Sequence, residues 1–478
     1  MDTAKHTARL FPLRPALVLL ASSLGVLVAQ VDTSVVTLAV KRIGTELGSS
    51  VSQMQWMIDS YNLVYAALLL TGGALGDLYG RRRVFVCGIA LFAIGSILCA
   101  AAPNSGALLF GRAVSGLGAA LELPMSLVLL TAAFPDEKPR QNALGIWASC
   151  NGLAFIVGPT LGGLLVDTAG WRSIFSLVLP LCAAALALAW TAVEESVDPR
   201  GASAVFSRER RLDLPGQAAA IAALGGLAFA AIEGPHLGWT SLAVVSGLAL
   251  GCIGAIAFVL VERKATGGLV PFELFSSRPF SAALAIAGLM TFGMYALLFL
   301  MPLYFQTLRN ETPLMAGVLM LPLSVSFVAV SQLNGPILRL IGPRATMASG
   351  MAAMGIGALL CGVVAAHAAF WPVAAALAVV GVGLGLNTAP VNSVAVQNVP
   401  RGRAGTASGL LNTARMVGAT LGIALLGAVF AHFAGQAASQ EGFLPGLRAA
   451  LAVGGIAELA GAAIALGFVR ASRRPGAG

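Results

Sequence analysis

Long apolar segments separated by short polar connections run along almost the whole of this 478-residue chain. A helix that crosses the hydrocarbon core of a bilayer needs roughly 20 apolar residues. Fourteen segments meet that requirement, at residues 15–40, 54–76, 84–102, 107–131, 142–166, 172–193, 214–234, 241–262, 280–305, 314–333, 345–366, 371–396, 404–431 and 447–469. Only 10% of the residues are charged, against about 25% in a soluble domain. The sequence therefore predicts an all-α membrane protein with 14 transmembrane helices.

Lysine and arginine are distributed unequally between the two sets of connections. With the N-terminus placed inside, the inner connections and termini hold 22 of the 29 basic residues, and the outer connections and span edges hold five. Basic residues accumulate on the cytoplasmic side of membrane proteins. We therefore expect a multi-pass protein of the cell membrane, inner or plasma, with both termini in the cytoplasm. The net charge of +9 has the same explanation, so no nucleic-acid partner is expected.

One connection occurs twice. The sequence GGALGDLYGRRR at 72–83 has a weaker copy, GPILRLIGPR, at 335–344. Each copy has two glycines seven residues apart, Gly73 and Gly80 in the first and Gly335 and Gly342 in the second, followed by basic residues. The offset of 262 residues makes the spans at 15–193 and 280–469 equivalent. The predicted organisation is a six-helix bundle at 1–193, a linker with two inserted helices at 194–279, and a second six-helix bundle at 280–478.

Four motifs then carry a family resemblance: DTSVV at 32–36, the loop GALGDLYGRR at 73–82, RAVSGLGAA at 112–120 and GPTLGG at 158–163. Together they resemble the major facilitator superfamily and, within it, the fourteen-helix drug/proton antiporter branch of the multidrug efflux type. The resemblance implies two six-helix bundles with a substrate site near the membrane midplane between them.

Three ionisable residues are candidates for proton coupling. Asp32, Asp59 and Arg112 lie inside spans, each a short distance from the outer end, so they are expected at similar depth. Placing a charge inside a membrane costs roughly 2.5–3.5 kcal/mol, so these residues are expected to have a role. One such role is proton coupling, in which a carboxylate binds or releases a proton as an arginine leaves or approaches it. A fixed structural ion pair with Arg112 is another, and a water-exposed outer mouth is a third for Asp59.

Five further residues are predicted to face the substrate cavity. For Glu122 the alternative is a hydrogen bond between helices, and for the two methionines it is contact with lipid. The polar pair in the span at 404–431 either hydrates the cavity or bonds across helices. The predicted cavity residues are Glu122, Met290, Met294, Asn412 and Arg415.

The repeated loop has a mechanical interpretation. An ion pair between its charged residues and the end of a neighbouring helix would latch the cytoplasmic side shut. The alternative is that the arginines only set the topology. The predicted gating residues are Gly73, Asp77, Gly80, Arg81 and Arg82.

The span at 142–166 carries a row of small residues and a proline. Small residues let helices approach closely in a membrane. We expect a tight seam that closes a leak path for protons, against the alternative of ordinary helix packing. The predicted antiporter-motif residues are Gly145, Gly158, Pro159, Gly162 and Gly163.

No lysine is followed by Ser or Thr as in a GK[ST] phosphate loop, so the chain cannot hydrolyse ATP by that route. We predict no enzyme activity, no catalytic residues, no metal and no cofactor, with a proton gradient as the energy source. The resemblance implies a proton-coupled antiporter that exports small amphipathic or cationic organic compounds, with the substrate, protons and the lipid bilayer as partners. Nothing in the sequence demands more than a monomer. The alternatives are a dedicated exporter of a self-made metabolite such as an antibiotic, and a non-transporting sensor or scaffold.

Overall fold

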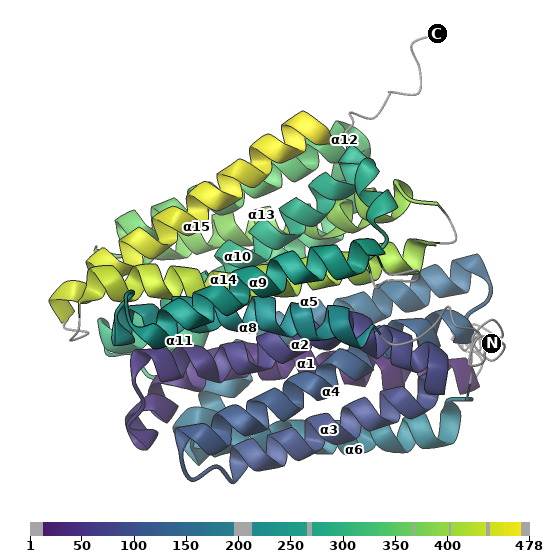
Figure 1. Cartoon of the computed structure of the whole chain (residues 1–478), viewed down its shortest axis with the longest axis horizontal. Coiled ribbons are helices and arrows are strands. Elements are labelled where there is room, and N and C mark those ends of the chain that lie inside the picture. Colours follow the sequence, from purple (N-terminus) through teal and green to yellow (C-terminus); the bar gives the residue numbers. More distant parts are fainter. Residues whose placement is uncertain are drawn as a thin grey trace, which may run out of the picture.

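The computed structural model describes residues 13–195, 213–264, 270–366, 369–400, 403–435 and 440–469, and these residues are almost entirely helical (Figure 1). The first helices are α1 (Leu13–Leu47), α2 (Val51–Tyr79), α3 (Arg81–Ala100), α4 (Ser105–Ala133), α5 (Glu137–Ala169) and α6 (Arg172–Ala192). A pair follows, α8 (Leu214–Leu237) and α9 (Leu242–Lys264), and then the 3-10 turn η1 (Phe272–Ser276). The last helices are α10 (Arg278–Thr307), α11 (Pro313–Leu319), α12 (Leu321–Val364), α13 (Trp371–Gln397), α14 (Ala404–Ala434) and α15 (Gln440–Phe468).

Within the described residues, 12 helical segments are long and apolar enough to cross a membrane. The predicted number of 14 is therefore not confirmed. Two places account for the difference. Helix α2 is not among the 12, because polar residues such as Gln55, Asp59 and Asn62 lower its hydropathy. The stretch Pro313–Val364 counts once, although Gly342 inside it has a non-helical backbone.

The helices run along the long axis of the molecule and gather in two groups (Figure 1). Helices α1 to α6 pack on one another, with α1 against α5 and α6 and α4 against α2 and α3. In the other group, α12 packs on α13 and α15, and α10 packs on α14 and α15. Figure 1 shows α3 and α6 along one side of the molecule and α15 along the opposite side. This all-helical arrangement is compatible with two six-helix bundles.

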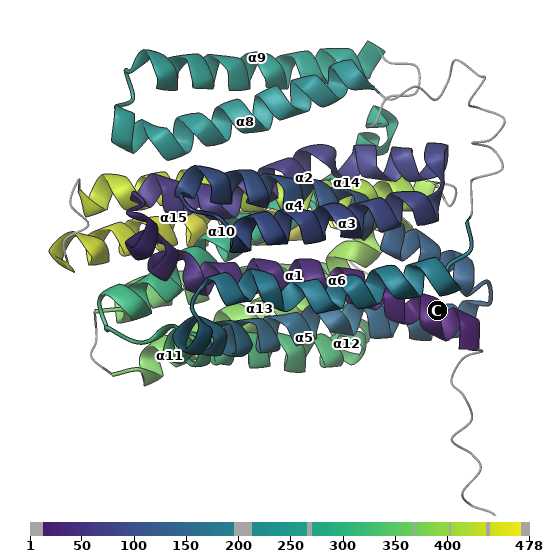
Figure 2. The ribbon, with the colours of Figure 1, turned by 90° about the horizontal axis from the view of Figure 1, so that it is seen from below.

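Helices α8 and α9 form a separate pair along one flank, as Figure 2 shows. Helix α8 contacts both α2 and α14. Polar bonds join it to α2 at two levels: Trp56 Nε1 donates to Glu233 Oε1 at 2.9 Å, and Gln217 Nε2 donates to the Ala67 carbonyl at 2.6 Å. Both of these bonds attach α8 to the first group of helices.

The repeated loop has the same backbone geometry in both copies. Gly80 joins α2 to α3 with φ 105° and ψ 131°, and Gly342 interrupts α12 with φ 77° and ψ 167°. Backbone of this kind is left-handed and favours glycine. The first glycine of each copy, Gly73 or Gly335, has helical neighbours and open space where a Cβ would be. The second glycine of each copy is therefore the one that the backbone requires.

Candidate functional site

A cavity of about 2110 Å³ lies between the two groups of helices. Helices α1, α2, α4 and α5 line one side of it, and α10, α12, α13 and α14 line the other. Its wall extends to Asp77, Arg81, Glu273 and Arg403 at the end of the molecule that carries Gly80, which we call the loop end. Ligand pockets for drug-sized molecules typically measure about 300–1,000 Å³, so this cavity has room for such a molecule and water.

The opposite end is closed by contacts between the two groups, and we call it the sealed end. Gln306 Nε2 on α10 donates to the Leu38 carbonyl on α1 at 3.0 Å. The Leu314 amide on α11 donates to Asp167 Oδ2 on α5 at 3.0 Å. Gln55 on α2 also donates to the backbone of α14. The structure is thus a conformation with the cavity reaching one end only.

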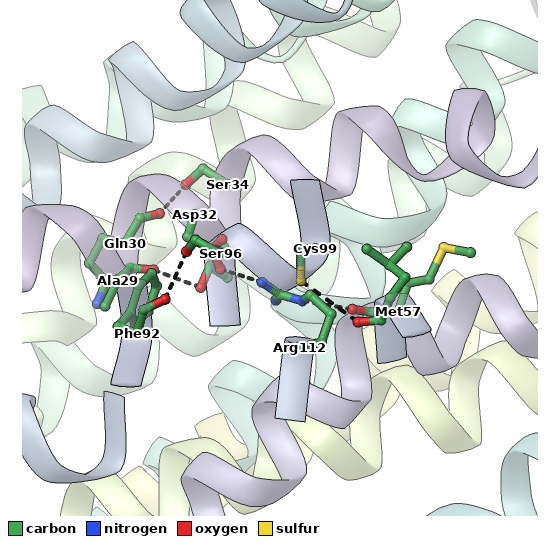
Figure 3. Close-up of polar contacts among 11 residues, drawn as sticks. Ala29, Gln30, Asp32, Ser34, Met57, Phe92, Ser96, Cys99 and Arg112 are labelled. Atoms are coloured by element: carbon green, nitrogen blue, oxygen red, sulfur yellow. Dashed lines mark hydrogen bonds and ion pairs between the residues drawn. The ribbon is translucent and has the colours of Figure 1, made fainter. Parts of the chain in front are cut away.

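The sequence-predicted contact between Asp32 and Arg112 is present (Figure 3). Arg112 Nη1 lies 2.5 Å from Asp32 Oδ2, and Arg112 Nε donates to the Met57 carbonyl at 3.0 Å. Both charged side chains are buried. The ring of Tyr61 covers the guanidinium, with its centroid 4.6 Å from Arg112 Cζ, and the same tyrosine lines the cavity. Tyr61 therefore contacts the ion pair and belongs to the cavity wall.

Asp59 follows Met57 on α2 and lies in the same region, as its expected depth requires. Its side chain is fully buried, so a water-exposed mouth is not its environment here. Neither carboxylate oxygen makes a hydrogen bond of normal geometry within the described part of the chain, and Asn62 is the polar side chain that interacts with it. It belongs neither to the Asp32–Arg112 pair nor to the cavity wall.

Glycines of the RAVSGLGAA motif hold α4 close to its neighbours. A Cβ on Gly116 would lie 2.5 Å from the Tyr61 carbonyl oxygen, and one on Gly118 would lie 2.5 Å from the Phe92 amide nitrogen. Only glycine permits these approaches without a shift of backbone. The close packing places Arg112, two turns into α4, beneath the Tyr61 ring.

Four of the five predicted cavity residues line the cavity: Met290, Met294, Asn412 and Arg415. Glu122 does not. Its side chain is fully buried inside the first group of helices, and its backbone and Cβ pack on Gly88 of α3. The sequence places Glu122 at the right depth, but the direction around a helix that is apolar on every face cannot be read from periodicity.

The gating-loop residues make their contacts inside the first group. Asp77 Oδ1 lies 3.2 Å from Arg81 Nη2. Arg82 Nη2 donates to the Trp190 carbonyl at the end of α6 at 2.7 Å, and the Arg82 amide donates to Glu195 Oε1 at 3.2 Å. This loop thus ties α3 to α6 while the cavity reaches the loop end.

Three residues of the antiporter motif form a seam near the sealed end. A Cβ on Gly158 would lie 2.5 Å from Ser34 Cβ, and one on Gly162 would lie 2.6 Å from Val35 Cγ1, so both glycines face α1. A Cβ on Gly163 would lie 2.6 Å from Leu314 Cα on α11. The motif therefore packs α5 on both groups of helices at once.

Pro159 takes part in the same seam through its carbonyl oxygen, which lies in direct contact with the Cβ position of Gly317 on α11. Gly145 is different. It lines the cavity, and nothing lies within 4 Å of its Cβ position. The seam consists of the downstream part of the motif, and Gly145 belongs to the open part of α5.

Several contacting residues were not predicted from the sequence. Tyr61, Tyr65 and Tyr295 line the cavity beside the charged groups. Tyrosine in an apolar span is a usable signal, because its hydroxyl needs a polar partner. Glu195, which caps the start of α3, carries no such signal, because it is 113 residues from Arg82 in sequence.

The comparison with known families decides the class. The profile of the Major Facilitator Superfamily matches residues 22–423. This chain belongs to that superfamily. The multidrug resistance protein Stp of Mycobacterium tuberculosis (strain CDC 1551 / Oshkosh) is 37% identical over 415 residues, covering 87% of this chain and 76% of the relative.

Other superfamily members are similar over comparable lengths. The methylenomycin A resistance protein of Streptomyces coelicolor is 33% identical over a region that covers 86% of this chain and 84% of the relative. The tetracenomycin C resistance and export protein of Streptomyces glaucescens is 32% identical over a region that covers 88% of this chain and 77% of the relative. The solved nucleoside transporter NupG shares the fold with a TM-score of 0.64 at 11% identity, covering 95% of this chain and 100% of that one. The superfamily protein is thus a non-enzymatic, multi-pass transporter of small molecules with drug-efflux relatives.

Proposed function

We propose that this superfamily member is a proton-coupled antiporter that exports small amphipathic organic compounds. The names of the relatives, which concern multidrug resistance, antibiotic resistance and export, support export of such compounds. The large cavity with methionines Met290 and Met294 on its wall suits apolar ligands of varied shape. Cationic substrates, the other class expected from the sequence, have less support, because Glu122 is not on the wall.

The observation that carries the proposal is the Tyr61 ring, which contacts the Asp32–Arg112 pair and belongs to the cavity wall. A substrate that packs on Tyr61 holds the guanidinium beneath the ring against Asp32. Without substrate, Arg112 can move away, and Asp32 is then an isolated carboxylate in an apolar environment, which favours its protonated form. When Arg112 returns, it favours the ionised form and expels the proton. Substrate and proton thus compete through one ion pair, as antiport requires.

We further propose the fourteen-helix branch and its topology. Helix α2 spans the membrane despite its polar residues, because Gln55, Asp59 and Asn62 are buried among other helices. Gly342 divides α12 into two spans, since a continuous helix of 44 residues would be about 66 Å long, more than twice the hydrocarbon core. The loop end is cytoplasmic, as are both termini, and the bundles are 1–193 and 280–478 with 194–279 inserted between them.

Conformational exchange follows from this topology. The described conformation faces the cytoplasm and takes substrate there. The exchange opens the sealed end and brings the loop end together, where Asp77, Arg81, Glu273 and Arg403 already line the approach. The protein works as a monomer with no metal or cofactor, and the proton gradient supplies the energy.

Inside-out vesicles with an acidic interior test the proposal. We expect an imposed pH gradient to drive accumulation of an amphipathic dye, and a protonophore to abolish it. Accumulation that is indifferent to the protonophore would reject proton coupling. The absence of transport for every member of a broad drug panel would favour a sensor or scaffold.

A dedicated exporter of a self-made metabolite is the second candidate, favoured by the similarity to the tetracenomycin C resistance and export protein. It predicts transport of one compound rather than many. A drug-susceptibility panel in an efflux-deficient host separates the two: broad resistance supports multidrug efflux, and resistance to a single class supports the dedicated exporter.

A further inference from the structure

Arg415 is a charged side chain on the cavity wall with most of its hydrogen-bonding capacity unused. It lies on α14, and its Nη1 donates to Asn412 Oδ1 over a long 3.4 Å. Its Nε and Nη2 are buried and have no acceptor within the described ranges. A guanidinium carries five N–H donors and no acceptor, so a buried one with few partners calls for an anion.

The position of Arg415 is fixed by helix packing. Thr291 Oγ1 on α10 donates to the Arg415 carbonyl at 2.6 Å. A Cβ on Gly418 would lie 2.5 Å from the same hydroxyl, so glycine there keeps α14 against α10. A site on rigid, closely packed helices is pre-organised for a ligand.

Two tyrosines accompany Arg415. Tyr65 on α2 and Tyr295 on α10 both line the cavity, and both interact electrostatically with Arg415. Their hydroxyls supply two further hydrogen-bond donors. Tyr65 belongs to the first group of helices and the other two residues to the second, so these three residues, the Arg415 cluster, span the interface between the groups.

No described carboxylate on the wall is placed to neutralise Arg415. The acidic residues of the wall are Asp77, Glu262 and Glu273, which lie at or near the loop-end termini of α2 and α9 and in η1. Asp77 is paired with Arg81, Glu273 with Arg403, and Glu262 accepts the Val270 amide. The buried acids that do not line the wall are Asp32, Asp59, Glu122 and Glu458.

We propose that the Arg415 cluster is a carboxylate-binding subsite and that the substrates are amphipathic organic anions. The inference rests on the proposed transport function and names its substrate class. The guanidinium fork takes the two carboxylate oxygens, and the tyrosine hydroxyls complete the coordination. Met290 and Met294, on the same stretch of α10 as Tyr295, pack against the apolar part of the molecule. An ammonium substrate would instead meet a positive charge.

Equilibrium binding to the purified full-length protein in lipid nanodiscs tests the subsite. The probes share one ring system: pyrenebutyrate, its methyl ester, and a pyrenebutyl-trimethylammonium ion. We expect the wild type to bind the carboxylate about tenfold or more tightly than the ester or the cation, the usual effect of a charge-assisted hydrogen bond. Arg415→Gln should lose that preference while binding the ester as the wild type does, which also shows that it is folded.

Arg403→Gln is the matched control, because it removes the same charge from the loop-end wall, where Arg403 is already paired with Glu273. It should keep the preference for the carboxylate. Arg415→Lys and Tyr295→Phe should each weaken carboxylate binding several-fold and keep ester binding, which preserves the test if Arg415→Gln does not fold.

The proposal is overturned if the wild type binds the ester or the cation as tightly as the carboxylate, or binds none of the three. It is also overturned if Arg415→Gln keeps the preference or Arg403→Gln loses it. The measurement uses no gradient, so it stands apart from proton coupling. A carboxylate preference without pH-driven transport would refute the proposed antiport alone.

Discussion

Arg112 Nη1 lies 2.5 Å from Asp32 Oδ2, and only 1% of the Arg112 side chain is exposed. Two opposite charges at this separation in an apolar environment depend on each other, because either one alone is an uncompensated buried charge. Arg112 also holds the backbone of α2 through the Met57 carbonyl. The pair therefore joins α1, α2 and α4 into one unit beneath the cavity.

A double-mutant cycle tests this dependence. Arg112→Met leaves Asp32 buried without its partner and should lower stability by about 3–5 kcal/mol, the usual effect of breaking a buried pair. Adding Asp32→Asn removes the stranded charge and should restore part of the loss. Thermal unfolding in detergent gives the comparison. Additive effects of the two substitutions would show that the side chains do not stabilise each other.

The repeated loop makes a prediction that applies to both copies. Gly80→Ala and Gly342→Ala place a Cβ on a left-handed backbone and should each cost about 1–3 kcal/mol. Gly73→Ala and Gly335→Ala add a methyl group in open space within a helix and should raise stability slightly, by up to about 1 kcal/mol. Thermal unfolding of the four variants is the measurement. Equal effects at the first and second glycines would contradict the common geometry of the two copies.

The seam near the sealed end predicts a shift between conformations. Gly163→Ala forces α5 away from Leu314 and should favour opening of the sealed end, whereas Gly145→Ala meets nothing and serves as the control. Spin labels at the exposed positions Thr168 and Met315 report the separation of α5 and α11. The mean distance should lengthen only in Gly163→Ala. An unchanged distance would assign the glycine to ordinary packing.

An anionic substrate changes the energetics of export. One proton entering while one monovalent anion leaves moves two charges, worth ~4.6 kcal/mol at 100 mV, and one pH unit adds ~1.4 kcal/mol. The total of ~6 kcal/mol supports a gradient on the order of 10⁴. A neutral substrate would reach roughly 400-fold and a monovalent cation about tenfold under the same conditions.

Transport currents in proteoliposomes measure this difference. We expect two charges to move for each anionic substrate molecule, and a current that rises with membrane potential. The pyrene ester, if transported, should move one charge and serves as the internal reference. Electroneutral transport of the anion would contradict the coupling of one proton to one exported anion.

The sequence predicts which residues form the site better than it predicts which way their side chains point. Asp32, Asp59 and Arg112 are predicted at similar depth, and of the two carboxylates Asp32 pairs with Arg112, since charges in a membrane need a partner. Glu122 was placed on the cavity wall and is not there, because its helix is apolar all round and offers no polar face to orient it. The downstream motif glycines Gly158 and Gly163 do form a seam, while Gly145 lines open space.

The helix boundaries show the same pattern. Helix α2 runs to Tyr79, beyond the predicted span at 54–76, and Gly80 follows it; its second copy, Gly342, has the same backbone form. Long-range partners could not be predicted. Glu195, which follows the end of α6, accepts the Arg82 amide, and Tyr65 and Arg415 line the same cavity from different groups of helices. Such contacts depend on how the helices are assembled, which no local pattern encodes.

The central claim is that Asp32 carries the coupled proton. Asp32→Asn in proteoliposomes tests it, with pH-driven uptake and substrate counterflow measured on the same preparation. We predict that pH-driven accumulation is lost while counterflow, which needs no net proton movement, is kept. Accumulation driven by the pH gradient at the wild-type level in Asp32→Asn would contradict the account.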